Sequence, residues 1–178
     1  MIITIAGNMG SGKTTVAKML AKRLGYPHYS GGQFMREMAK QRGIGFLELT
    51  KMALIDDSID FQIDEMIKKK GETEDNFIIE GRIAFAFIPH SFKVFLRVEP
   101  SEGARRIFQS NRSDEKENTT IQKTVQNIQI RHDSENQRYR VLYNLNPDEE
   151  GHYDLIVDTT SIPVQEVTDL IVNALKLT

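Results

Sequence analysis

Three closely spaced glycines followed by a lysine and a threonine constrain this chain more than any other part of its sequence. They lie in the string Gly-Asn-Met-Gly-Ser-Gly-Lys-Thr at residues 7–14, which matches the pattern G-x-x-x-x-G-K-[ST]. The apolar, mostly β-branched run at residues 2–6 predicts a buried strand, and residues 14–24 predict a helix that ends at Gly25. A strand, a glycine-rich turn and a helix in this order are typical of a parallel α/β sheet.

The same string predicts a binding site for a nucleoside triphosphate. Glycines allow backbone N–H groups to converge on a phosphate, and the helix N-terminus adds the positive end of its dipole. Lys13 can reach the β and γ phosphates, and the Thr14 hydroxyl can ligate Mg²⁺. A dinucleotide site is not expected, because Thr15 stands where G-x-G-x-x-G requires its last glycine. The residues expected to bind ATP are Gly7, Asn8, Met9, Gly10, Ser11, Gly12, Lys13, Thr14 and Thr15.

The rest of the chain alternates between predicted strands and helices. Further strands are predicted at residues 29–30, 77–79 and 94–98, and within 152–157. Further helices are predicted at residues 33–42, 46–53, 58–70, 101–109, 119–145 and 164–175, and Gly71 is interpreted as the residue that ends the helix at 58–70. This alternation predicts an α/β fold, with a parallel sheet covered by helices on both faces.

Composition limits the remaining classes of function. A length of 178 residues favours one domain, and a net charge of −2 gives no electrostatic argument for binding nucleic acid or an anionic membrane. With no cysteine, disulfides and thiol nucleophiles are excluded. The chain has no run of 18 apolar residues and its first residues do not read as a signal peptide, so we expect a cytoplasmic protein.

Several segments beyond the glycine-rich loop resemble cytidylate kinases of the archaeal type, a group of nucleoside monophosphate kinases. They are Tyr-Ser-Gly-Gly-Gln-Phe-Met-Arg-Glu-Met at residues 29–38, Phe-Ile-Ile-Glu-Gly-Arg at 77–82, Arg-Tyr at 138–139 with Tyr143, and His-Tyr-Asp-Leu-Ile-Val-Asp-Thr at 152–159. The resemblance implies a three-layer P-loop kinase fold with about five parallel strands. It also implies one kinase domain over residues 1–178, with a helical acceptor-binding segment at about 31–71 and a short lid at about 111–118.

The same resemblance implies a monomeric enzyme that transfers the γ-phosphate of ATP to CMP or dCMP with Mg²⁺, giving ADP and CDP or dCDP. Two other interpretations stay open. One is a P-loop kinase for another acceptor, such as adenylate, shikimate or a coenzyme precursor. A shikimate-type kinase would have Asp-x-Asp after the second strand, where this chain has Ser30-Gly31-Gly32. The other is a regulatory module that binds a nucleotide without catalysis.

Arginines are the side chains best suited to hold the acceptor. A nucleotide phosphate is mostly ionised at pH 7, so its transfer needs positive charge more than a general base. On the predicted helix at 119–145, Arg131 and Arg138 are seven residues apart and interrupt an otherwise apolar face. They could instead be solvated or paired with Glu135, and Arg36 could be paired with Glu37. The expected catalytic residues are Lys13, Arg36, Arg82, Arg131 and Arg138.

Acidic residues and the lid complete the expected site. Glu80 ends a predicted strand, where it would lie near the Mg²⁺ that Thr14 binds, or would pair with Arg82. Arg112, in the polar run expected to form the lid, is placed with the ATP-binding residues. The chain departs from the family pattern at Ser110, where an arginine is expected, and at Met35, where an aromatic residue is commoner.

Overall fold

The computed structural model describes residues 1–110 and 117–177. Within these residues one five-stranded sheet has the order β2-β3-β1-β4-β5, and every neighbouring pair is parallel. The strands are β1 (Ile3–Gly7), β2 (His28–Ser30), β3 (Ile78–Glu80), β4 (Phe92–Arg97) and β5 (Leu155–Asp158). The glycine-rich loop therefore leaves the central strand, and the sequence-based prediction of a parallel α/β sheet is confirmed.

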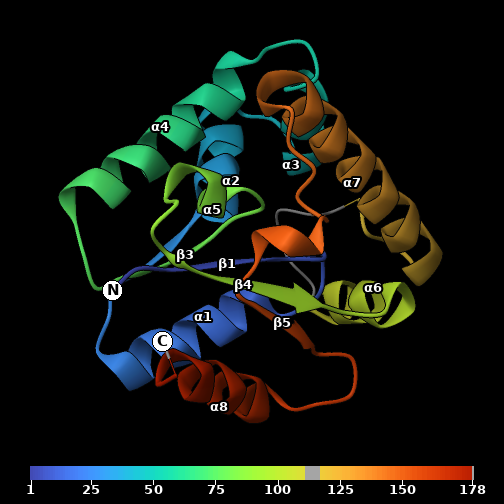
Figure 1. Ribbon diagram of the computed structural model, residues 1–178. Coiled ribbons are helices and arrows are strands. Elements are labelled where there is room, and N and C mark those ends of the chain that lie inside the picture. The colour runs from blue at the N-terminus through green and yellow to red at the C-terminus, as the bar shows by residue number, and fades with distance from the viewer. Residues whose placement is uncertain (111–116, 178) are drawn as a thin grey trace.

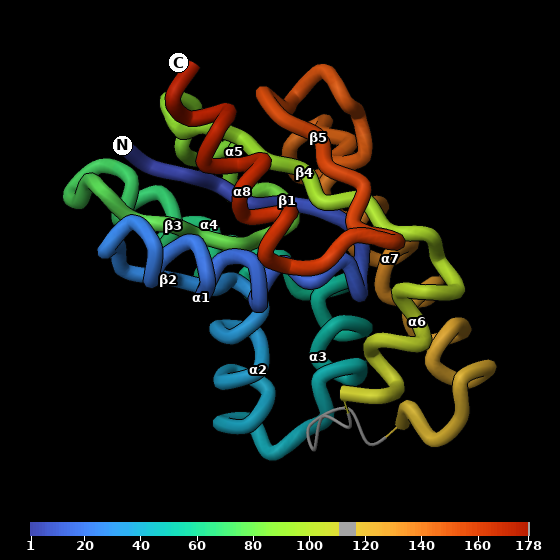
Figure 2. The backbone as a smooth tube through the Cα atoms, turned by 90° about the horizontal axis from the view of Figure 1, so that it is seen from below, coloured from blue at the N-terminus to red at the C-terminus, as the bar shows by residue number. Residues whose placement is uncertain are grey.

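Helices cover both faces of the sheet, which makes three layers (Figure 1). One face carries α1 (Lys13–Leu24) and α8 (Val164–Leu175), and the other carries α4 (Ser58–Thr73) and α5 (Ala84–Phe87). Figure 2 shows α2 (Gly31–Gln41), α3 (Phe46–Met52) and α6 (Pro100–Gln109) beyond one end of the sheet. The remaining helices are the long α7 (Ile121–Tyr143) and the 3₁₀ turn η1 (Glu150–His152).

The alternation of side chains along the strands explains the two covered faces. Ile3 and Ile5 of β1 belong to a buried cluster with residues of α1 and α8, whereas Ile2 belongs to a cluster with residues of α4 and α5. Phe77 and Ile79 join this second cluster, next to Ile2. Because successive side chains of a strand point to opposite faces, a continuous apolar run fills both layers.

The predicted end of the helix at residues 58–70 is wrong. Gly71 does not end α4, which continues to Thr73. A Cβ atom at Gly71 would lie 2.8 Å from Cγ1 of Ile88, so the glycine lets α4 pack closely against the residue that follows α5. The short helix α5 itself was not predicted from the sequence.

Two further findings concern the expected lid and the membrane. Most of the expected lid, residues 111–116 with Arg112, lies outside the described residues. Within the parts that are described, no helix is both long enough and apolar enough to cross a membrane.

Candidate active site

The glycine-rich loop is shaped by two close backbone approaches. A Cβ atom at Gly7 would lie 2.2 Å from the carbonyl oxygen of Leu96, and one at Gly10 would lie 2.3 Å from that of Gly103. Both glycines also have positive φ angles, of 145° and 81°. Since other residues rarely adopt these angles and have no space here, the sequence pattern is tied directly to the shape of the loop.

Lys13 starts α1 and folds back over the loop. Its Nζ donates hydrogen bonds of 2.8 Å to the carbonyl oxygens of Gly7 and Asn8. Burial and the nearby Arg82 guanidinium lower the pKa of Lys13 to about 8. The ammonium group is thus held inside the loop, at the place where a phosphate chain would lie.

Thr14 and Glu80 place two oxygen atoms that could ligate a metal ion beside Lys13. The register pairs Glu80 of β3 with Ile5 of β1, and Thr14 Oγ1 donates to Glu80 Oε2 over 2.9 Å. Burial acts to raise the pKa of Glu80, but His28, Thr14 and Lys13 outweigh it and hold that pKa below its usual value. An ionised carboxylate next to a hydroxyl fits Mg²⁺, which takes few protein ligands and completes its shell with water and phosphate.

Within the described residues, no group of three or more acidic or histidine side chains could hold a metal ion by itself. A magnesium ion at Thr14 and Glu80 would therefore depend on a nucleotide for further ligands.

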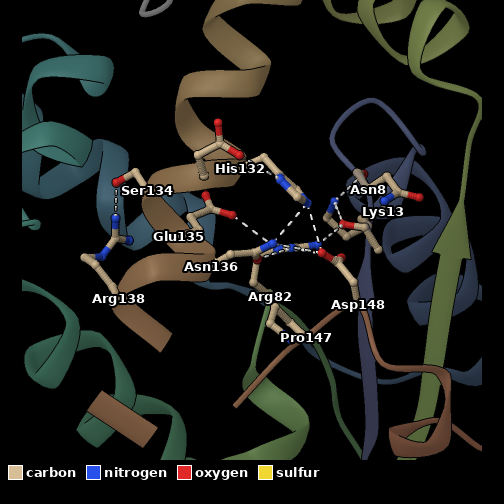
Figure 3. Close-up of polar contacts among 12 residues, drawn as sticks. Asn8, Lys13, Arg82, His132, Ser134, Glu135, Asn136, Arg138, Pro147 and Asp148 are labelled. Carbon is tan, nitrogen blue, oxygen red and sulfur yellow. Dashed lines mark hydrogen bonds and ion pairs between the residues drawn. The ribbon is translucent and has the colours of Figure 1, made fainter. Parts of the chain in front are cut away.

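Arg82 lies in a buried polar network that joins three parts of the chain (Figure 3). Its guanidinium donates to Asn136 and to Asp148, each over 3.1 Å, and its Nε lies 3.2 Å from Glu135 Oε2. Burial acts to lower the pKa of Arg82, but Glu135 and Asp148 outweigh it and raise that pKa. His132 lies 2.9 Å from the other Asp148 oxygen, so the network holds α7 against the end of β3.

Arg138 of α7 has a separate set of partners, on α4 and on α7 itself. It is only 4% exposed, and it donates through Nε to Asp60 of α4 over 2.5 Å and through Nη1 to Ser134 over 2.7 Å. Its partner is therefore Asp60, whereas Glu135, which the sequence suggested as an alternative partner, lies against Arg82.

Arg36 of α2 and Arg131 of α7 meet at one aromatic ring. The Cζ atoms of Arg36 and Arg131 lie 4.8 Å and 4.5 Å from the centroid of the Phe46 ring, within the range of cation–π contacts. Arg36 also donates to the carbonyl oxygen of Gly32 over 3.2 Å.

One cleft brings these groups together. Every expected catalytic or metal-binding residue lines it. These residues are Lys13, Thr14, Arg36, Glu80, Arg82, Arg131 and Arg138.

Asp64 is a further acidic residue of the cleft, one turn along α4 from Asp60. Its Oδ2 accepts a 2.5 Å hydrogen bond from the hydroxyl of Tyr143. Burial and the Asp60 carboxylate raise the pKa of Asp64 to about 7, although the hydrogen bond from Tyr143 acts in the other direction. Asp64 therefore changes charge near neutral pH.

This raised pKa predicts an effect of pH on stability. The folded chain binds a proton at Asp64 up to about pH 7, whereas the unfolded chain loses it near pH 4, so Asp64 destabilises the fold as pH rises between these values. We expect the free energy of unfolding of Asp64→Asn, relative to wild type, to increase by about 2–3 kcal/mol from pH 5 to pH 8. Urea unfolding at both pH values measures this difference. An equal difference at the two pH values would contradict the prediction.

Several residues in and around the cleft were not found from the sequence. Phe46 and Asp64, which line the cleft, and Asp148, which binds Arg82, carry no motif, and their partners are distant along the chain. A signal existed only for Glu135, which shares the predicted face of α7 with Arg131 and Arg138. Asp60 also lines the cleft, and nothing in the sequence links it to Arg138.

With this geometry in place, similarity to known proteins decides the family. The model of the cytidylate kinase-like family matches residues 2–161. The chain belongs to this family. It is 33% identical over 177 residues to the cytidylate kinase of Methanobrevibacter smithii, covering 99% of both chains.

Two further similarities are to proteins that are not named cytidylate kinase. This chain is 31% identical over 171 residues to an S-adenosylmethionine-dependent nucleotide dehydratase of Lacinutrix mariniflava. The match covers 96% of this chain but 35% of the dehydratase. The structure of the shikimate kinase of Acinetobacter baumannii superposes on this one with a TM-score of 0.64, at 13% sequence identity. The match covers 98% of this chain and 92% of the shikimate kinase. The last similarity concerns the fold alone.

Proposed function

We propose that the protein transfers the γ-phosphate of ATP to CMP or dCMP, which gives ADP and CDP or dCDP. The observation that supports this best is the distribution of positive charge in one cleft. Lys13 lies in the phosphate-binding loop, while Arg36 and Arg131 lie on α2 and α7, outside the loop. A protein that only binds ATP needs the first cation, whereas a second anionic substrate accounts for the other two.

The proposed transfer depends on positioning and electrostatics. The loop and Lys13 would bind the phosphates of ATP, and Arg36 and Arg131 would bind the phosphate of the acceptor. This acceptor phosphate has a second pKa of about 6, so its oxygens are ionised at pH 7 and no general base is required. Thr14 and Glu80 would hold Mg²⁺, which supplies charge neutralisation on the phosphates of ATP.

Asp64 supports cytosine as the base of the acceptor. Its carboxylate lines the cleft near Ile63, Ile67 and Met35, which offer apolar surface for a base. An ionised carboxylate accepts a hydrogen bond from an exocyclic amino group, which cytosine and adenine carry, and repels the carbonyl oxygen that uracil and guanine present there. The similarity to cytidylate kinases then favours cytosine over adenine.

The proposal extends to the organisation of the enzyme. We propose one kinase domain over residues 1–178, in which α2, α3 and α4 form the acceptor-binding segment and residues 111–118, with Arg112, form the lid. We also propose that the enzyme acts as a monomer, which light scattering would test.

In place of an Asp-x-Asp sequence at the end of β2, Ser30 caps α2 by accepting a hydrogen bond from the backbone of Gln33, which argues against shikimate as the acceptor.

A coupled assay of ADP release tests the proposed function. With ATP and Mg²⁺, we expect CMP and dCMP to be phosphorylated faster than UMP, AMP, GMP or shikimate. Faster turnover of AMP or shikimate would assign another acceptor, and no ADP release with any acceptor would favour the regulatory module.

The variant Asp64→Asn tests the base preference within the same assay. Its amide can donate to a carbonyl oxygen or accept from an amino group, so the ratio of kcat/KM for CMP to that for UMP should fall by about 10-fold or more. Glu65→Gln, an exposed neighbour on α4, serves as the control and should leave the ratio unchanged. An unchanged ratio in Asp64→Asn would remove Asp64 from the base site while leaving phosphoryl transfer itself untouched.

A further inference from the structure

The short helix α3 contacts the arginines of the cleft at both of its ends. Phe46, its first residue, places its ring near the guanidiniums of Arg36 and Arg131. One turn later, the carbonyl oxygen of Thr50 accepts hydrogen bonds from Ser134 over 3.2 Å and from Arg138 over 3.5 Å. The helix therefore lies between α2 and α7 and contacts both.

The ring of Phe46 is held firmly in this place. Phe46 is 5% exposed, and its carbonyl oxygen accepts a 3.0 Å hydrogen bond from Thr50 Oγ1. Thr50 is fixed to α7 in turn, so the ring has a defined position relative to Arg131. Arg36 reaches the same ring from α2, on the other side of α3.

Two guanidiniums near one ring face an electrostatic problem before an acceptor arrives. Their like charges repel each other, and their long side chains lose much rotamer freedom when they are held in one conformation. The face of an aromatic ring carries partial negative charge, and it attracts a guanidinium by electrostatics and by planar stacking. A single phenylalanine can therefore reduce the cost of keeping both cations together.

We propose that Phe46 is a positioning residue for the acceptor phosphate, which it serves by holding the guanidiniums of Arg36 and Arg131 beside one ring of the cleft. This inference rests on the proposed function, since it assumes that the two arginines bind the acceptor. Phe46 acts through the arginines and does not itself contact the reacting atoms. Part of the entropy of ordering two arginines is then lost during folding, before the acceptor binds.

The first test separates the π face of Phe46 from its apolar bulk. Phe46→Leu keeps an apolar side chain and removes the ring, and Phe46→Tyr keeps the ring. We expect Phe46→Leu to lower kcat/KM for CMP by about 10- to 100-fold, with KM for ATP changed less than about 2-fold, and Phe46→Tyr to restore most of the loss.

A matched control accounts for general loss of stability. Phe95 of β4 is also 5% exposed and does not line the cleft, so Phe95→Leu should destabilise the protein without a selective effect on the acceptor. Equal losses of kcat/KM in Phe46→Leu and Phe95→Leu, or an equal rise of KM for ATP and for CMP in Phe46→Leu, would overturn the proposal.

A second test does not depend on catalysis. In NMR spectra of the protein without nucleotide, the ring current of Phe46 should shift the side-chain signals of Arg36 and Arg131, and Phe46→Leu should remove both shifts. Inorganic phosphate is then titrated while these arginine signals are followed. Weaker binding in Phe46→Leu than in wild type and Phe46→Tyr would support the positioning role even if no nucleotide were phosphorylated, a result that contradicts only the proposed function. Equal phosphate affinity in all three proteins would overturn the positioning role.

Discussion

Replacement of Lys13 by alanine should lower kcat by about 10²–10³-fold or more while the protein stays folded. The Nζ atom lies within the loop, bonded to the carbonyl oxygens of Gly7 and Asn8, where it can turn to a phosphate with little movement. No other side chain of the loop carries positive charge. Since Lys13 is half-buried and desolvation already lowers its pKa to about 8, its loss removes an unfavourable burial together with two hydrogen bonds.

Single-turnover kinetics with ATP, Mg²⁺ and CMP measure the effect on transfer, and thermal unfolding measures the effect on the fold. Lys18→Ala is a suitable control, because Lys18 lies on α1 as well but is exposed to solvent. Turnover of Lys13→Ala close to that of Lys18→Ala would contradict the assignment of Lys13 to the donor phosphates. A large loss of thermal stability would contradict the expectation that the fold is kept.

The second large effect is expected on stability. Arg138→Ala should lower the free energy of unfolding by about 3–5 kcal/mol at pH 8, because it leaves the Asp60 carboxylate buried without its charge partner. Both residues of the pair are 4% exposed, and Asp64 adds a second carboxyl group next to Asp60. Burial raises the pKa of Asp60 even though the bond with Arg138 opposes it. Protonation of Asp60 at lower pH should therefore reduce the loss of stability in Arg138→Ala.

Urea unfolding at pH 8 and pH 5 tests this expectation. The double variant Asp60→Asn/Arg138→Met removes both charges, and it should recover more than half of the stability lost in Arg138→Ala. Arg140→Ala, an exposed arginine on α7, should have almost no effect. If Arg138→Ala were as stable as Arg140→Ala, the buried pair would not contribute as described.

Sequence patterns predicted the parts of this molecule in which neighbours along the chain determine the structure. The loop at residues 7–14 needs its glycines for backbone reasons that are local to it, and the strands reveal themselves as short apolar runs. The face of α7 that carries Arg131 and Arg138 was also predicted, since helical spacing alone puts them together. In the structure both arginines line the cleft.

Contacts between distant segments could not be predicted in this way. Asp60 and Arg138 are 78 residues apart, and their pairing depends on how α4 packs beside α7. Phe46 looks like any apolar residue at the start of a helix until α2 and α7 bring their arginines to its ring. Gly71 reads as the end of a helix because the sequence does not reveal Ile88 beside it.

The resting position of Lys13 has a consequence for the end of each catalytic cycle. When ADP leaves, an ammonium group that had bound its phosphates would normally be left without a hydrogen-bond partner in a desolvated loop, which would oppose departure of the product. Here the carbonyl oxygens of Gly7 and Asn8 can accept hydrogen bonds from the ammonium group as the phosphates leave. The loop thus supplies its own replacement for the leaving phosphates, which should favour product release, the step that limits turnover in many enzymes.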